Sequence, residues 1–284
     1  MINKVKAMMM VKKKTVTKKD LDSLKEFLVM CSEAYYNTDT NENISITSMP
    51  SNKNSFTVSS IGNCIYSIGG IGYDIADKNE CLDITNDQGW IEKTPMLSKR
   101  YNLTSSVVNN NIYCIGGNVY RTTTNGITTG INECYDPVTD TWTTKTDMPN
   151  KRYNLTSSVV NNKIYCIGGQ HATLNKRDIN EEYDPSTDSW TTKTEMTTDR
   201  FGLSSSVVEN KIYCIGGKIG SSVLNTNECY DPLTDSWTTK SSIETTLEES
   251  IAETVGNCIY IIGGRNNDSY LLNTNYCYIP KNDN

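Results

Sequence analysis

The sequence predicts an all-β fold that consists of repeated four-stranded sheets. The segment 164–169, Ile-Tyr-Cys-Ile-Gly-Gly, returns almost unchanged at 112–117, 212–217 and 259–264, and more loosely at 65–70. Successive Gly-Gly pairs lie 47, 52, 48 and 47 residues apart. A period near 50 residues in strand-like units is typical of a β-propeller or a similar closed array, because a single unit cannot bury its own faces.

The repeat assigns most of the chain to one domain. Residues 44–284 are predicted to form the propeller, and residues 1–43 to form a basic tail, a helix and a linker. Each unit must stack on its neighbours to bury its faces, so the units share one fold. We expect five blades, over about residues 50–94, 97–146, 149–194, 197–241 and 245–284.

The segment before the propeller carries one helical pattern. Thr17 is suited to cap a helix, and Asp20 follows three residues later. Apolar residues then recur at spacings of three and four, at Leu21, Leu24, Phe27, Leu28 and Cys31. This predicts a helix over about residues 18–35, with one apolar face that docks on the propeller or meets a partner helix.

Residues 44–47 are predicted to close the ring. They alternate like a short strand immediately before Met49-Pro50. In a later unit the same position, before Met148-Pro149, holds the Trp-bearing segment 140–146, whereas the last unit stops at residues 278–280 without such a strand. We therefore expect residues 44–47 to be the fourth strand of the last blade, which removes the open edge of that blade.

The third unit illustrates the strands expected in each blade. Residues 152–160 alternate small and branched side chains, as an inner strand should. Residues 163–168 form the second strand, which ends in two glycines that permit positive φ. Residues 181–183 form the third strand, which Asp-Pro ends, and the Thr-rich segment 189–193 forms the outer strand.

Nine of the ten cysteines lie in the repeat. Neighbouring antiparallel strands could in principle bridge Cys114 to Cys134. However, Glu182 occupies the corresponding partner position of Cys166, so the bridge is not a feature of every unit. We therefore expect small buried thiols. CxxC pairs and Cys/His clusters are absent from the sequence, so we expect no metal and no other cofactor.

The formal net charge of −6 is unevenly distributed. Residues 1–25 carry eight Lys and two Asp, which makes them +6 and leaves −12 on the remainder. An acidic body argues against nucleic acid as the main partner, since phosphate contacts dominate that affinity. The sequence has no membrane-spanning stretch, and the apolar run 7–11 is too short for a signal peptide. We expect a cytoplasmic monomer.

The repeated residues resemble the kelch family of β-propellers, over about residues 44–280. The first unit departs from the pattern by Lys53 in the Arg position, and the last by Leu247. Kelch propellers more often have six or seven blades, and no BTB-like adaptor fits in residues 1–48, so a ubiquitin-ligase role is not implied. The residues that carry the resemblance are the di-glycines, Tyr135-Asp136-Pro137, Tyr183-Asp184-Pro185, Tyr230-Asp231-Pro232, Trp90, Trp142, Trp190, Trp237, Arg100, Arg152 and Arg200.

The loops after the Gly-Gly pairs differ most between units, at residues 71–79, 118–132, 170–180, 218–227 and 265–275. Such variation on a repeated scaffold indicates either a binding function or neutral drift of surface loops, and the two remain open.

The resemblance implies that these loops share one rim of the propeller with the starts of the inner strands. A positive rim of this kind could hold carboxylates by bidentate Arg contacts. The repeated Arg residues equally suit a role in bracing neighbouring blades, which we favour, and the aromatic residues after them could stack on a ligand or pack. The candidate binding residues are Lys53, Arg100, Arg121, Arg152, His171, Lys176, Arg177, Arg200, Lys218 and Arg265, with Tyr101, Tyr153 and Phe201 beside them.

The inventory of side chains disfavours catalysis. His171 is the single histidine, so neither a placed Ser-His-Asp triad nor a two-histidine copper site is supported. We expect a non-catalytic module that binds a protein partner, such as one with an acidic segment. The alternatives are a sugar-acting enzyme that resembles the kelch-type sialic-acid mutarotases, with His171, Arg177 and Glu residues in a central pocket, and a carbohydrate-binding surface protein.

Overall fold

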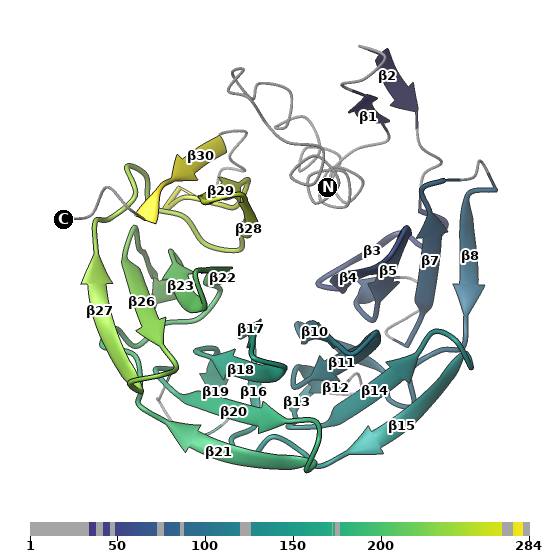
Figure 1. The fold of residues 1–284 in the computed structure, drawn as a ribbon, viewed down its shortest axis with the longest axis horizontal. Coiled ribbons are helices and arrows are strands. Elements are labelled where there is room, and N and C mark those ends of the chain that lie inside the picture. The colour runs from purple at the N-terminus through teal and green to yellow at the C-terminus, as the bar shows by residue number, and fades with distance from the viewer. Residues whose placement is uncertain are drawn as a thin grey trace.

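The computed structural model describes residues 34–37, 42–45, 49–72, 77–85, 88–119, 126–171, 173, 177–268 and 275–280. Every named element in these ranges is a β-strand, and the sheets follow one another around a common axis (Figure 1). The all-β prediction is confirmed. The helix predicted over residues 18–35 lies outside the described residues, except for Ala34 and Tyr35, which belong to strand β1 (Ala34–Asn37) instead.

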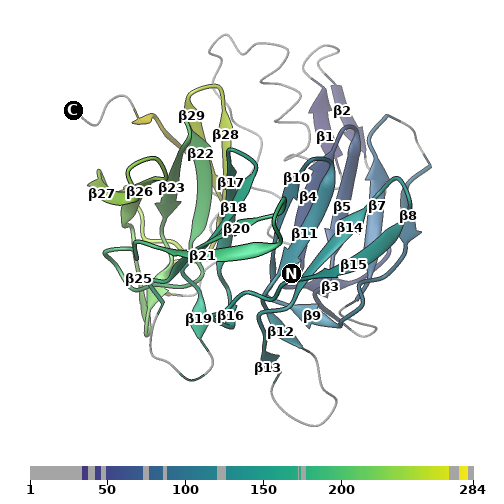
Figure 2. The same cartoon turned by 60° about the horizontal axis from the view of Figure 1, so that its bottom comes forward.

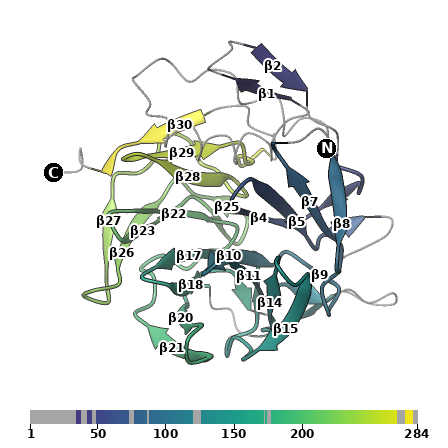
Figure 3. The same cartoon turned by 45° about the vertical axis from the view of Figure 1, so that its right-hand side comes forward.

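Five sheets, numbered here as blades 1 to 5 in chain order, each begin with an inner strand near the axis (Figures 1 and 3). These strands are rich in Ser, Thr and Val, because small and branched side chains let neighbouring blades approach closely. The inner strands are β4 (Thr57–Ile61), β10 (Thr104–Val108), β17 (Thr156–Val160), β22 (Ser204–Val208) and β28 (Ile251–Val255).

The second strand of each blade carries the repeated hexapeptide. Its two glycines have positive φ. In blade 2 their neighbours leave no room for a side chain: a Cβ on Gly116 would lie 2.7 Å from the Arg152 carbonyl oxygen, and one on Gly117 2.6 Å from that of Tyr101. The second strands are β5 (Cys64–Ile68), β11 (Asn111–Ile115), β18 (Lys163–Ile167), β23 (Lys211–Ile215) and β29 (Cys258–Ile262).

The third strand pairs with the second, and four blades add an outer strand. The third strands are β7 (Asn79–Asp83), β14 (Asn132–Asp136), β20 (Asn180–Asp184), β26 (Asn227–Asp231) and β30 (Asn275–Tyr278). The outer strands are β8 (Trp90–Lys93), β15 (Thr141–Lys145), β21 (Ser189–Lys193) and β27 (Ser236–Lys240).

Blade 5 differs from the prediction, since its sheet in the described residues is β28-β29-β30 without a fourth strand. Ile44 and Ser45, expected to close the ring, lie in β2 (Glu42–Ser45), which pairs with β1 so that Ala34 faces Ser45. Only four residues separate β1 from β2, so this local pairing has a far smaller loop-closure cost than pairing with β30. Residues 46–47 lie outside the described residues.

The hydrophobic core lies between the blades. Between blades 2 and 3, side chains from both sheets form one buried cluster, and similar clusters lie between the other neighbouring blades. Each of these four clusters needs side chains from two sheets, so a single blade cannot form one alone. The cluster between blades 2 and 3 consists of Val108, Tyr113, Ile115, Cys134, Met148, Leu155, Ile164, Cys166 and Tyr183.

A repeated set of hydrogen bonds joins the outer strands of neighbouring blades. Between blades 2 and 3, the Thr146 backbone N–H donates to Asp188 Oδ1 at 2.8 Å, and Trp190 Nε1 donates to the Thr146 carbonyl at 2.8 Å. The Tyr183 hydroxyl also donates to Asp188 Oδ1. The same contacts recur around Thr94 and Thr194, which explains why blades 2, 3 and 4 repeat this Tyr and this Trp.

Hydroxyl groups join the inner strands. The Ser157 hydroxyl in β17 lies 2.7 Å from Thr104 Oγ1 and 2.8 Å from Ser106 Oγ in β10. Ser105 contacts β4 in the same way, and Ser205 contacts β17. The alternation of Ser, Thr and Val in the inner strands therefore supplies both apolar packing and polar contacts between blades.

The expectation that all cysteines of the repeat are thiols is wrong for one pair. Cys258 in β29 and Cys277 in β30 form a disulfide with Cα atoms 5.9 Å apart. The two residues are diagonal neighbours, since Tyr260 is the partner of Cys277 in the sheet register. The bridge considered from the sequence, Cys114 to Cys134, would join different positions of the second and third strands. The cysteines in blades 1 to 4 are free thiols.

In blade 3 the same diagonal holds an ion pair. Lys163 Nζ lies 2.7 Å from Glu182 Oε1, and the Tyr165 hydroxyl donates to Glu182 Oε2 at 2.8 Å. Burial acts to raise the pKa of Glu182, but the hydrogen bonds from Lys163 and Tyr165 outweigh it and hold the pKa below its usual value. An ionised Glu182 therefore stabilises the folded state above the unfolded pKa, and this contribution is lost as the pH falls through the folded pKa.

Glu182→Gln should therefore lower the melting temperature more at pH 7 than in acid, once the pH has fallen through the lowered folded pKa and wild-type Glu182 is also neutral. Thermal unfolding of both proteins across this pH range measures the difference. The exposed Glu244→Gln is the matched control, for which we expect little difference at either pH. A wild-type advantage over Glu182→Gln that stays constant or grows in acid would contradict this account.

Candidate functional site

One end of the propeller, called here the loop face, carries the segments that follow the Gly-Gly pairs (bottom of Figure 2). These segments pair with the residues just before the inner strands, which brings the variable loops beside the starts of these strands as expected. Isolated bridges from Phe201 to Lys218 and from Glu248 to Arg265 continue the pattern in blades 4 and 5. The short strands are β3 (Lys53–Asn54), β6 (Ile71–Gly72), β9 (Arg100–Tyr101), β12 (Asn118–Val119), β13 (Ile127–Thr128), β16 (Arg152–Tyr153), β19 (Gln170–His171), β24 (Lys218–Ile219) and β25 (Ser222–Val223).

A chain of backbone hydrogen bonds runs around the axis at this face. Asn102 N–H donates to the Ser55 carbonyl, Asn154 to Asn102, Gly202 to Asn154, and Glu249 to Gly202, at 2.8 to 3.0 Å. All five residues have positive φ, between 51° and 65°. The backbone of the loop face is thus fixed from blade 1 to blade 5, whatever side chains it carries.

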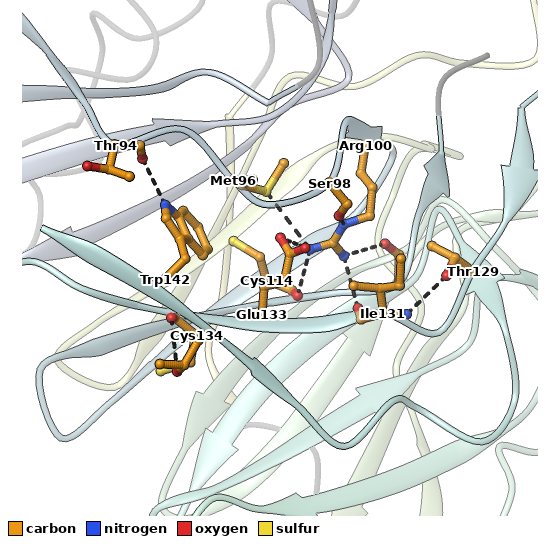
Figure 4. Close-up of polar contacts among 12 residues, drawn as sticks. Thr94, Met96, Ser98, Arg100, Cys114, Thr129, Ile131, Glu133, Cys134 and Trp142 are labelled. Atoms are coloured by element: carbon orange, nitrogen blue, oxygen red, sulfur yellow. Dashed lines mark hydrogen bonds and ion pairs between the residues drawn. The ribbon is translucent and has the colours of Figure 1, made fainter.

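The repeated Arg residues lie below this chain, in the core. The Arg100 guanidinium donates to the carbonyls of Gly116 and Ile131, both at 2.9 Å, and forms an ion pair with Glu133 at 3.0 Å (Figure 4). The Arg100 carbonyl accepts from Gly70 N–H of the preceding blade at 2.9 Å. One residue therefore joins the Gly-Gly pairs of two consecutive blades.

The same contacts recur for Arg152 in blade 3, Arg200 in blade 4 keeps the pairing with Glu and a hydrogen bond to the Cys214 carbonyl, and Lys53 replaces Arg in blade 1. Arg152 pairs with Glu181 at 2.7 Å, Arg200 pairs with Glu228, and Lys53 pairs with Glu80 at 2.9 Å. The three Arg residues have an exposed fraction of 0%, and Lys53 one of 7%. These four charges are buried and paired within their own blades, so they are not presented at the loop face as the binding hypothesis expects. The backbone carbonyls of the three Arg residues accept hydrogen bonds from the preceding blade, as the bracing interpretation expects.

Blade 5 replaces the buried ion pair by apolar and aromatic groups. Leu247 occupies the Arg position and is fully buried, and its carbonyl still accepts from Gly217 N–H of blade 4. The sheet register puts Tyr276 at the Glu position, and its hydroxyl donates to Thr245 Oγ1. Buried ion pairs can often be replaced by well-packed side chains of similar volume, whereas removal of one partner leaves a buried charge.

The loop-face cations are each paired with a carboxylate. Arg177 lies 3.3 Å from Asp199, and its side chain is only 13% exposed. Lys218 lies 2.7 Å from Glu248, and Arg265 lies 3.5 Å from Glu249. The predicted positive rim is thus a row of ion pairs across the described residues. Arg121 and Lys176 lie outside the residues that the structure describes.

His171 lies at the end of β19, where the register pairs it with Arg152. Its Nδ1 accepts a hydrogen bond from the Thr173 N–H at 3.1 Å, and the ring is half-buried. This contact orients the ring within its own loop. Within the described ranges, no group of three or more His, Cys, Asp and Glu side chains could hold a metal ion.

Three aromatic residues lie at the loop face beside the segments that follow the Gly-Gly pairs. Tyr101, Tyr153 and Phe201 each follow a buried Arg in successive blades. Burial and the nearby Tyr101 raise the pKa of Tyr153, and their effect exceeds the opposite effect of the nearby Arg177. The Phe201 ring centroid lies 5.5 Å from the Arg177 guanidinium carbon and 5.3 Å from Lys218 Nζ, within cation–π range. We call Tyr101, Tyr153, Phe201, Arg177, Lys218 and Glu248 the loop-face cluster.

Sequence reasoning identified the aromatic residues and the cations of this cluster but missed Glu248 and Asp199. Glu248 follows Leu247, as Phe201 follows Arg200, so its place at the loop face was available from the repeat. Asp199 precedes the buried Arg200 of blade 4 and pairs with Arg177 in the loop of blade 3. No helix in the part of the chain that the structure describes is sufficiently long and apolar for a membrane span.

Comparison with known proteins agrees with this geometry. Residues 102–284 match the family model of the KLHDC2/KLHL20/DRC7 Kelch-repeats domain. The solved structure of YjhT is similar, with a TM-score of 0.69 and 17% sequence identity over 78% of this chain and 74% of that chain. At this identity the similarity concerns the fold alone. Comparison with curated proteins gives no significant match.

Replacing Arg152 by Leu alone should destabilise the propeller by about 3–5 kcal/mol, because Glu181 would keep a buried and unpaired charge. The double variant Arg152→Leu/Glu181→Tyr copies the pair found in blade 5 and should recover at least about 1 kcal/mol of that loss. Denaturant unfolding of both variants and of Glu181→Tyr measures the coupling. Additive effects of the two substitutions would contradict the proposed dependence of Glu181 on Arg152.

Proposed function

The chain belongs to the kelch-repeat family, and we propose that it is a non-catalytic module that binds a protein partner through the loop face. The proposal rests on the different environments of two residues that are adjacent in the chain. The repeated Arg152 is buried between blades, whereas Tyr153, the next residue, is half-buried at the loop face. The buried ion pairs that blades 1 to 4 share serve the scaffold, so the residues at the loop face remain for recognition.

The chemistry of the loop-face cluster favours a protein partner. Tyr and Arg side chains contribute most to the affinity of protein interfaces, because they combine apolar area with polar groups. Tyr101 and Tyr153 are half-buried, and the chain of backbone hydrogen bonds holds them on a fixed frame. A frame that is already ordered reduces the entropy lost on binding.

Arg265 determines which charge the partner should carry at this site. Its ion pair with Glu249 is open to water, with exposed fractions of 46% and 39%. Such pairs are worth only about 0–1 kcal/mol, so a carboxylate of the partner can replace Glu249 at little cost. Lys218 and Arg177 are more enclosed and stay with their own carboxylates. The partner therefore presents an acidic side chain at blade 5 and apolar or aromatic groups toward Tyr153.

A sugar-acting enzyme is the second candidate, and two contacts disfavour it. The enzyme hypothesis needs His171, Arg177 and a carboxylate around one substrate. Arg177 is engaged by Asp199 and stacked near Phe201, and His171 accepts from Thr173 of its own loop. Carbohydrate binding without catalysis would still use Tyr101 and Tyr153 as stacking platforms, so the test below includes it.

The loop-face variant Tyr153→Ala/Arg265→Ala should weaken partner binding by at least about tenfold, because it removes an aromatic anchor and the exchangeable cation. Proteins captured from the source lysate by the wild type are quantified by mass spectrometry, and the candidate is then purified and titrated. The control is Val138→Ser/Leu233→Ser, which alters exposed residues of the turns at the opposite end, 89% and 93% exposed.

The control should bind within about twofold of the wild type, since its substitutions lie away from the loop face. A partner that loses affinity for the control, or that keeps full affinity for the loop-face variant, would overturn the proposal. A glycan array probed with the same three proteins tests the carbohydrate alternative. Glycan binding that only the loop-face variant loses would replace a protein partner by a sugar.

A further inference from the structure

One diagonal between the second and third strands holds a matched pair in three blades. In blade 5 it is the disulfide Cys258–Cys277, and in blade 3 it is the ion pair of Lys163 with Glu182. In both blades the two residues are related in the same way. The residue on the third strand lies opposite a Tyr of the second strand, and its matched partner lies two residues before that Tyr.

Blade 1 carries cysteines at both ends of this diagonal. Tyr66 lies opposite Cys81, and Cys64 precedes Tyr66 by two residues. Because the register is the same, the backbone holds Cys64 and Cys81 as it holds the bonded pair of blade 5, whose Cα separation of 5.9 Å is within the usual range for a disulfide. Both residues are thiols in this structure.

The remaining blades lack a matched pair at this position. Cys134 of blade 2 has Asn111 at the other end of the diagonal, and Cys229 of blade 4 has Lys211. A cysteine at one end alone cannot form the bond, so blades 2 and 4 serve as internal controls. The cysteine pairs occur in the first and the last of the five blades.

We propose that Cys64 and Cys81 are a site of reversible disulfide formation, which ties β5 to β7 in blade 1 as Cys258–Cys277 ties β29 to β30 in blade 5. The oxidant is a small-molecule disulfide such as oxidised glutathione. The half-buried Cys64 is the attacking residue, because Cys81 is only 3% exposed. This inference is independent of the proposed partner binding.

The exchange proceeds in two balanced steps. The Cys64 thiolate attacks one sulfur of oxidised glutathione, forms a mixed disulfide and releases one glutathione. Cys81 then loses its proton, attacks the Cys64 sulfur and releases the second glutathione. The protein gives up two electrons and two protons, and the two glutathione molecules take them up.

The second step is the slower one at neutral pH. In the reduced protein, burial and the neighbouring Cys64 thiol raise the pKa of Cys81 to about 12. Burial is the larger cause and persists once Cys64 carries glutathione, so the Cys81 thiolate stays scarce. Once formed, the bond joins the two strands that precede and follow the loop of residues 71–79 at the loop face. Oxidation would thus restrain the hairpin that supports the blade 1 part of that face.

The test uses the full chain in mixtures of reduced and oxidised glutathione at pH 8. Samples are quenched with acid, free thiols are alkylated, and peptides are mapped by mass spectrometry. We expect a peptide pair linked through Cys64 and Cys81, in an amount that rises with the oxidised fraction. The melting temperature should rise with it by roughly 5–10 °C, because the link restricts the unfolded chain.

Cys134→Ser is the matched control and should form the link as the wild type does, while Cys81→Ser should stop with glutathione attached to Cys64. If Cys81→Ser does not fold, the peptide map of the wild type still decides the question. Three results would overturn the proposal: glutathione retained on Cys64 of the wild type, a link from Cys64 to another cysteine, or no link at any glutathione ratio.

Discussion

The buried cation at the start of an inner strand is the constraint on which the other contacts of this propeller depend. Arg152 accepts from Gly117 of blade 2 through its carbonyl and donates to Gly168 of blade 3 through its guanidinium. Its charge is removed from water, so the residue is stable there only beside Glu181. The glycine pair, the Arg and the Glu are therefore one unit of structure, and none of them can change alone.

This constraint leaves the next residue free to vary. The backbone of Tyr101, Tyr153, Phe201 and Glu248 is fixed by the Arg positions on one side and by the chain of hydrogen bonds around the axis on the other. The side chain at this position is Tyr in blades 2 and 3, Phe in blade 4 and Glu in blade 5. The side chains at this position are thus held on a backbone frame that is already ordered.

The sequence was sufficient for the features that repeat. The glycine period predicted the sheets, and the presence of Arg100, Arg152 and Arg200 at one position of three units favoured bracing over binding. The sequence did not predict contacts that depend on the register between strands or that join residues of two neighbouring units. The pairing of Lys218 with Glu248 joins two blades, and the Cys258–Cys277 diagonal becomes close only in a twisted sheet. Whether residues 44–45 pair with β1 or with the last blade depends on the relative free energies of local and distant strand pairing, and no sequence motif encodes that difference.

Native-state hydrogen exchange of Arg152→Leu and Tyr153→Ala would test this account most directly, because the two residues are adjacent in the chain. We predict that Arg152→Leu speeds exchange at the amides of both Gly117 and Gly169, in two blades, since it loosens the contacts that position them. Tyr153→Ala should leave both amides as protected as in the wild type. Faster exchange confined to blade 3 in Arg152→Leu, or equal effects of the two substitutions, would contradict the assignment of scaffold to Arg152 and recognition to Tyr153.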